Sequence, residues 1–237
     1  MPSNHSSIAG TINNIGLVYD SQNRFDEALI KYEEALRIKK ETLPSNHSSI
    51  ADTINNFANL YYSQNRFDDA LIYHEEALRI KKETLSYNHS SVASTINNIA
   101  VVYQSQNRFD EALIKYEEAL RIYKETLPSN HSSIAETINN IGEVFSKQNR
   151  FDEALIKYEE ALIIYKETLP SNHSTIALTI KNIGEVYQSQ NRFDDAHIKY
   201  EEALRIYKET LPKNHPDITM VQIKILFLNG MNSNRLR

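Results

Sequence analysis

The sequence contains no cysteine and only five glycines among its 237 residues. Without cysteine, the chain forms neither disulfides nor zinc–thiolate sites, and it has no thiol to act as a nucleophile. The five glycines are not clustered, so no glycine-rich loop of the kind that cradles phosphate groups is present. Composition therefore excludes thiol enzymes and zinc–thiolate proteins and argues against a nucleotide-binding loop.

Long apolar runs and a strong positive charge are also absent. The longest apolar run, Ile225 to Leu228, is far shorter than the roughly 20 residues of a membrane-spanning helix. Met1 to Asn4 lead into no apolar signal-peptide core. The formal charge of −5 is spread along the chain, whereas nucleic acids and anionic membranes attract basic patches. We therefore expect a cytoplasmic protein that binds neither nucleic acid nor membrane.

The chain does contain a long internal repeat. The segment from Asn13 to Ala28 returns four more times, and each copy begins 42 residues after the last. A fixed period of this size predicts stacked structural repeats rather than one closed globular core.

The apolar pattern predicts two helices in each repeat, named here the A helix and the B helix. In the first copy, Ile8, Ile12, Ile15 and Tyr19 fall on one face of the A helix. The B helix begins near Phe25 and carries its own apolar face. Neither face can be buried by one helix alone, so each A helix must pack on its B helix and on the neighbouring repeat.

Polar segments separate the predicted helices. Asn23 lies where the chain must turn from the A helix to the B helix, and Asn tolerates the left-handed conformation of such a turn. A Leu-Pro-Ser-Asn-His segment, as at residues 43–47, separates one repeat from the next, and its Asn or His can cap the following helix.

These signals predict one solenoid over residues 1–228 and a flexible tail over residues 229–237. The predicted parts of the solenoid are repeats at 5–43, 47–85, 89–127, 131–169 and 173–211, and a capping helix at 216–228.

The small and aromatic positions of each pair resemble the tetratricopeptide repeat (TPR). The same spacing occurs in all five pairs, and in the first pair the matching positions are Ile12, Ile15, Gly16, Tyr19, Ala28, Tyr32 and Ala35. The ordinary TPR period is 34 residues. A period of 42 with Leu-Pro-x-Asn-His and Asn-Asn-x-Gly/Ala motifs is similar to the kinesin light chain subgroup.

The resemblance implies an all-α fold, a right-handed TPR superhelix (α-solenoid) of five helix-turn-helix repeats plus the C-terminal capping helix. It implies a non-catalytic scaffold for protein–protein interaction that needs no cofactor. Kinesin light chains hold cargo-adaptor peptides in this way. Their N-terminal heptad region, which joins the motor, has no counterpart in this sequence.

In TPR proteins the A helices line a concave groove that holds a peptide. At 100° per residue, Asn13 and Leu17 lie on a face turned away from the apolar stripe, with Asn14 about a quarter turn further round. An amide offers both a donor and an acceptor, so a ladder of Asn can bind a peptide backbone. The alternative is that some of these Asn hold the repeats together. The predicted groove residues are Asn13, Asn14, Leu17, Asn55, Asn56, Asn59, Asn97, Asn98, Val101, Asn139, Asn140, Glu143, Lys181, Asn182 and Glu185.

Charge at the groove positions predicts the kind of partner. Lys181 is the clear cation there, and the carboxylates would select a neutral or basic peptide. The acidic residues at these positions are Asp20, Asp52, Glu136, Glu143 and Glu185.

Two other functions remain open from the sequence. The apolar Ile223, Ile225 and Phe227 near the C-terminus, together with an uncapped first helix, allow a scaffold that associates with itself through its ends. A helical-repeat nucleic-acid binder is disfavoured by the lack of a basic groove.

Recurring ionisable residues suggest no metal or catalytic site. The six His at period 42, from His5 to His215, would lie too far apart to share an ion, so we expect them in loops or caps. Glu33-Glu34 recurs in every repeat on a solvated face, whereas a catalytic pair needs one special environment. His74 and His197, which replace Tyr and Leu, are expected near the surface.

Overall fold

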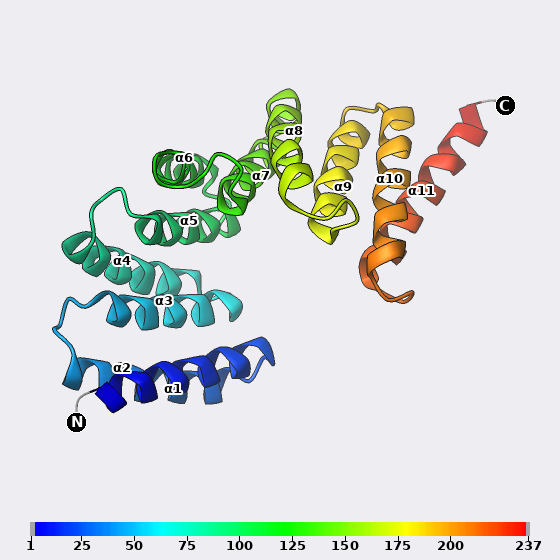
Figure 1. Ribbon diagram of the computed structural model, residues 1–237. Coiled ribbons are helices and arrows are strands. Elements are labelled where there is room, and N and C mark those ends of the chain that lie inside the picture. The colour runs from blue at the N-terminus through cyan, green and yellow to red at the C-terminus, as the bar shows by residue number, and fades with distance from the viewer. Residues whose placement is uncertain (1–2, 236–237) are drawn as a thin grey trace. The chain divides into compact units, whose positions relative to one another are not determined.

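The structure is a computed structural model that describes residues 3–235, with side chains described for residues 7–230. All regular secondary structure in this range is helical (Figure 1). The helices are α1 (Ser3–Ser21), α2 (Phe25–Thr42), α3 (Ser48–Ser63), α4 (Phe67–Thr84), α5 (Ser90–Ser105), α6 (Phe109–Thr126), α7 (Ser132–Lys147), α8 (Phe151–Thr168), α9 (Ser174–Ser189), α10 (Phe193–Thr210) and α11 (Pro216–Arg235).

The helices pair in the order in which they occur, within two compact units, Met1–Thr126 and Leu127–Arg237. In the first unit α1 pairs with α2, α3 with α4 and α5 with α6, and successive pairs meet through α2 with α3 and α4 with α5. In the second unit α7 pairs with α8 and α9 with α10, α8 meets α9, and α11 packs on α10 (Figure 1). The predicted all-α architecture of repeated A and B helices is confirmed.

An Asn in the left-handed conformation makes the turn between the A and B helices of each repeat. The Arg that follows closes the hairpin: the Arg24 guanidinium lies 4.3 Å from the centroid of the Tyr19 ring and binds Glu27 in the first turn of α2. The predicted turn is therefore confirmed. With φ of 58° or 59°, its residues are Asn23, Asn65, Asn107, Asn149 and Asn191.

Histidine caps the A helices that follow a Leu-x-x-Asn-His segment. His47 Nδ1 accepts a hydrogen bond from the backbone N–H of Ser49 at 3.1 Å, which satisfies one free donor at the start of α3. His89, His131, His173 and His215 do the same. For these five the predicted capping role is confirmed. His5 is different, because α1 already begins at Ser3, and the His5 side chain lies outside the described residues.

The A and B helices of a pair meet at a small residue. Tyr200 on α10 is fully buried, and a Cβ added to Gly184 on α9 would lie only 2.8 Å from Tyr200 Cε1. A larger side chain would push the two helices apart. The small residue predicted at this position thus has a steric reason.

The last helix differs from its predicted bounds. α11 packs on α10 through Ile218, Val221 and Leu228, which are buried. It continues past Leu228 to Arg235, because Asn229-Gly230 does not form the left-handed cap that would end it; Gly230 has no positive φ. Residues 229–235 of the predicted tail are therefore helical, and residues 236–237 lie outside the described part of the chain.

Candidate functional site

The predicted groove residues of the fourth and fifth repeats lie together. α7 and α9 form the walls of an open pocket of about 410 Å³, and Tyr158 of α8 lies at its base. Both polar and ionisable side chains reach it. The predicted residues that line it are Asn139, Asn140, Glu143, Lys181, Asn182 and Glu185.

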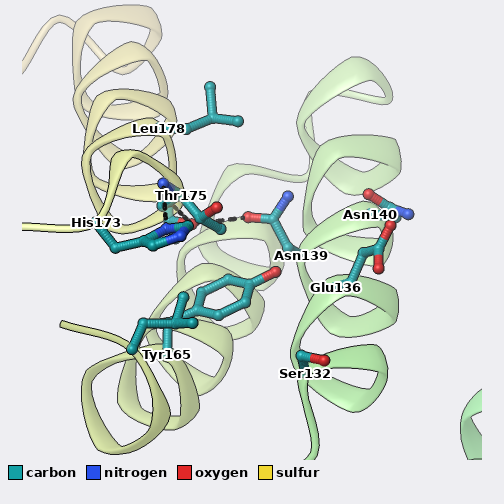
Figure 2. A pocket seen from close by; sticks show the side chains of 10 residues that line it. Ser132, Glu136, Asn139, Asn140, Tyr165, His173, Thr175 and Leu178 are labelled. Carbon is teal, nitrogen blue, oxygen red and sulfur yellow. Dashed lines mark hydrogen bonds between the residues drawn. The ribbon is translucent and has the colours of Figure 1, made fainter. Parts of the chain in front are cut away.

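A second pocket of about 480 Å³ lies further toward the start of the same two helices, and it is named here the Glu136 pocket. Glu136, Asn139 and Asn140 of α7 line one side, while Thr175 and Leu178 of α9 line the other (Figure 2). The pocket is closed below by Tyr165 and Leu169 at the end of α8 and the loop after it. Of these residues, Glu136, Asn139 and Asn140 were predicted in the groove from the sequence, whereas Tyr165 was not.

Burial controls the protonation of the tyrosines beneath these pockets. Desolvation raises the pKa of the Tyr165 hydroxyl, and the nearby Glu136 carboxylate raises it further. Burial likewise raises the pKa of Tyr158, with Glu143 and Glu185 as smaller contributors. Both hydroxyls therefore remain protonated and can donate hydrogen bonds at neutral pH.

Two lysines balance one of the groove carboxylates. Lys224 Nζ of α11 lies 3.2 Å from a Glu185 oxygen, and Lys181 Nζ lies 3.8 Å from the same oxygen. Glu185 is thus less available to attract a basic partner than its sequence position suggested. Glu136 and Glu143 have no cationic partner among the described residues.

Several Asn of the predicted ladder are used within the protein. Asn13 Oδ1 accepts a hydrogen bond from Asn56 Nδ2 at 3.0 Å, which joins α1 to α3. Asn139 Oδ1 accepts one from Thr179 Oγ1 at 3.3 Å, which joins α7 to α9. At these two positions Asn holds neighbouring repeats together, as in the alternative prediction.

The rest of the predicted groove in the first unit is less open. A small pocket of about 120 Å³ is lined by Asn59, Asn98 and Val101. Asn97 is half-buried. Asn14 and Leu17 are exposed on α1, and neither lines a pocket described here.

His74 corrects one prediction. It was expected near the surface, but it is 1% exposed, and its Nδ1 donates to Asn55 Oδ1 at 2.8 Å. Burial lowers the pKa of His74 to about 4, and the nearby Lys81 contributes in the same direction. The imidazole takes the inward position that Tyr32 and Tyr200 take in other repeats. His197, by contrast, keeps 31% of its side chain exposed, in agreement with its predicted place.

Two buried lysines were missed by sequence analysis. Lys39 is 5% exposed and donates to the Ser49 carbonyl at 2.9 Å and to Thr53 Oγ1 at 2.7 Å. Lys81 is 4% exposed and forms a 3.0 Å ion pair with Asp52. A signal existed: the same column of the repeat holds Tyr123, Tyr165 and Tyr207, and a column of tyrosines predicts an inward position.

The described residues contain neither a metal-binding cluster nor a membrane-spanning helix. That part of the chain contains no group of three or more His, Asp or Glu placed to hold a metal ion. None of the helices described combines the length and the apolar character that crossing a bilayer requires.

The chain matches family models by sequence and solved structures by fold. A family model described as the tetratricopeptide repeat matches residues 49–125 and 133–209, and a second model of the same description matches residues 8–49. No protein of curated function matches the sequence.

Solved structures show the same fold at low sequence identity. BtubC (BKLC) from P. vanneervenii has a TM-score of 0.78 and 24% identity, over 90% of this chain and 86% of that one. A putative kinesin light chain from Podosopora anserina, with nearly identical TPR-like repeats, has a TM-score of 0.72 and 22% identity, over 87% and 97%. Aspartyl phosphate phosphatase F from Bacillus subtilis has a TM-score of 0.77 and 16% identity, over 95% and 57%.

Proposed function

Because the chain belongs to the tetratricopeptide repeat family, with repeats of the kinesin light chain-like form, we propose that it is a non-catalytic scaffold that binds a peptide segment of a partner protein. Protein interaction is the general role of such repeats. The finer proposal is that the peptide lies against the polar face of the A helices. A cargo-adaptor role in the cytoplasm is the form of this function that the resemblance to kinesin light chains favours.

The observation that carries the proposal is the pair of open pockets between α7 and α9. They bring amides and carboxylates of two repeats to one surface. The side-chain amides of Asn140 and Asn182 have no hydrogen-bond partner among the described residues, so both can bind a peptide backbone.

We further propose that the peptide is neutral or basic. In this surface Glu185 is balanced by two lysines, but Glu136 and Glu143 are not. The unbalanced carboxylates would repel an acidic peptide and favour a basic one.

The test is a peptide-library screen of the intact chain beside an Asn140→Ala/Asn182→Ala variant. Each lost hydrogen bond is worth roughly 0.5–1.5 kcal/mol, so we expect the double variant to bind its peptides about tenfold more weakly. The control is Asn172→Ala, which changes an exposed Asn in the loop before α9. Peptides bound equally by all three proteins would contradict a site on α7 and α9.

Self-association is the second candidate, and the exposed ends of the helix array favour it. On α1, Ile8, Ile15 and Val18 are 49%, 39% and 53% exposed. On α11, Leu226 and Phe227 are 69% and 55% exposed. Of the C-terminal residues singled out in the sequence, Ile223 and Phe227 are exposed, but Ile225 is buried against α10.

Sedimentation over a wide concentration range tests this candidate. If the ends associate, the sedimentation coefficient rises with concentration, and Leu226→Glu/Phe227→Glu abolishes the rise because charges replace apolar contact area. A coefficient independent of concentration in the unsubstituted chain would rule the candidate out.

A further inference from the structure

The second repeat shows how this fold binds a cation beside an A helix. The Lys81 ammonium group lies 3.0 Å from the Asp52 carboxylate of α3 and 3.5 Å from the Ser91 carbonyl of α5. The Lys39 ammonium group, one repeat earlier, binds the equivalent carbonyl of Ser49 and the Thr53 hydroxyl. A carboxylate on one A helix and a carbonyl with a hydroxyl on the next thus form a set of acceptors for an ammonium group.

The fourth repeat has the same acceptors but no lysine. Glu136 occupies the position of Asp52, two repeats later, and Tyr165 occupies the position of Lys81. Thr175 and Thr179 of α9 occupy the positions of Ser49 and Thr53, and both line the Glu136 pocket. Among the five repeats, only the fourth combines an acidic residue at the first position with Tyr at the second.

In the second repeat the Lys81 side chain occupies the place that is equivalent to the Glu136 pocket, whereas in the fourth repeat this place is open. Glu136 is exposed, and no cation among the described residues pairs with it. Tyr165 is only 5% exposed, and Figure 2 shows its hydroxyl directed into the pocket, where no hydrogen bond is made to it. Although most of the Tyr165 ring is buried, its hydroxyl oxygen does not belong to the buried unpaired polar atoms of the described residues, so it is open to the pocket and available to a ligand.

The apolar residues of the pocket suit the stem of a long side chain. Leu178 of α9 is 41% exposed at its edge, and the Tyr165 ring and Leu169 lie beneath. A lysine entering from the open side can lay its four methylenes on these groups while its ammonium group reaches the carboxylate.

We propose that the Glu136 pocket binds a lysine side chain of the partner peptide, with Glu136 as the counter-ion. The Tyr165 hydroxyl, the Thr179 hydroxyl and the Thr175 carbonyl complete the acceptors for the ammonium group. This assignment rests on the proposed peptide-binding function and gives it a specificity: one basic side chain at a defined place in the fourth repeat. Acetylation of that lysine removes its charge and would release the peptide.

The first test compares three short peptides that differ at one residue, which is lysine, Nε-acetyl-lysine or norleucine. Binding to the intact chain is measured by NMR chemical-shift changes at the backbone amides of α7 and α9. We expect the lysine peptide to shift amides around Glu136 and to bind about two- to fivefold more tightly than the two neutral peptides. Equal affinities, or shifts elsewhere only, would overturn the proposal.

The second test uses variants of the two key positions. Glu136→Gln should remove the preference for lysine, whereas Glu159→Gln, on the exposed face of α8, should keep it. Tyr165→Lys should recreate the ion pair of the second repeat and fill the pocket from within, so the lysine peptide should no longer bind there. Circular dichroism and thermal unfolding identify any variant that has lost its fold.

The variants separate this proposal from the proposed function. If Tyr165→Lys loses only the preference for lysine and still binds neutral library peptides through Asn140 and Asn182, both proposals are supported. If neutral peptides bind and the lysine preference is absent from the unsubstituted chain, the lysine pocket is wrong while peptide binding stands. If Tyr165→Lys keeps its folding and its full preference for lysine, the pocket is also wrong.

Discussion

At the scale of single residues, His74 shows how one substitution changes the chemistry of a repeat. It lies between α3 and α4 with one hydrogen bond, to Asn55, and its pKa is lowered to about 4. In the unfolded chain a His titrates near pH 6.5, so between pH 6.5 and 4 the unfolded state binds the proton that the folded state refuses. Acidification through this range therefore destabilises the folded state.

We predict that the free energy of unfolding falls by up to about 3 kcal/mol as the pH drops from 7 to 4 because of His74. The measurement is urea unfolding across this range for the unsubstituted chain and for His74→Phe. The variant loses the Asn55 hydrogen bond at every pH, so its absolute stability is lower, but its pH dependence should be flatter by this amount. Identical pH profiles would show that His74 is not buried as described.

The buried lysines show why part of the site was missed when each helix was considered by itself. On an amphipathic helix a lysine is normally assigned to the solvated face. Lys39 is buried only because the next repeat supplies the Ser49 carbonyl and the Thr53 hydroxyl, and this pairing depends on packing between repeats. The contacts that Asn13 and Asn139 make between repeats also depend on this packing. Their amides are equally suited to a ligand, so the sequence alone does not distinguish the two roles.

At the scale of helices, the local signals were sufficient for most boundaries. The left-handed Asn and the His caps act through their own backbone neighbours, so their sequence pattern predicts them directly. The predicted end of α11 was wrong. Asn229-Gly230 allows a helix to end but does not require it, and the helix continues because no left-handed turn is formed there.

The two glycines of α1 give opposite predictions. A Cβ at Gly16 would lie 2.5 Å from Tyr32 Cε1, whereas one at Gly10 meets no atom within 4 Å. Gly16→Ala should destabilise the first hairpin by about 1–3 kcal/mol through overpacking. Gly10→Ala should stabilise α1 by about 0.5–1 kcal/mol through backbone entropy. Urea unfolding of both variants measures the difference, and a change of the same sign in both would refute the steric account.

The His caps predict a local effect at the start of an A helix. His131→Ala removes the acceptor for the Ser133 amide, which should cost about 0.5–2 kcal/mol and speed hydrogen exchange in the first turn of α7. His131→Asn provides another good capping acceptor and should restore most of the protection. If exchange at Ser133 is the same in all three proteins, the cap does not stabilise the helix.

At the scale of the whole molecule, stability should be distributed along the repeats, because each pair contacts only its neighbours. Ala100 of α5 is fully buried. Ala100→Arg would place a charge at this buried position of the α5–α6 pair. We therefore expect α5 and α6 to lose protection from hydrogen exchange while α9 and α10 keep theirs. The matched control is Ile114→Arg on the exposed face of α6, where Ile114 is 62% exposed. A loss of protection in every helix at once would show a single cooperative fold instead.

The same buried contact between neighbouring repeats recurs along the chain, and this affects how a protein of this kind can gain or lose repeats. Ile50, Val92, Ile134 and Ile176 occupy the same place at the start of successive A helices and are all buried to a similar degree. A duplicated segment of 42 residues would present this same surface at both of its ends and find a matching surface on either side. Gain or loss of whole 42-residue units is therefore compatible with the stacking of the remaining helices, whereas an insertion of another length inside a helix would turn part of its buried face away from its neighbour.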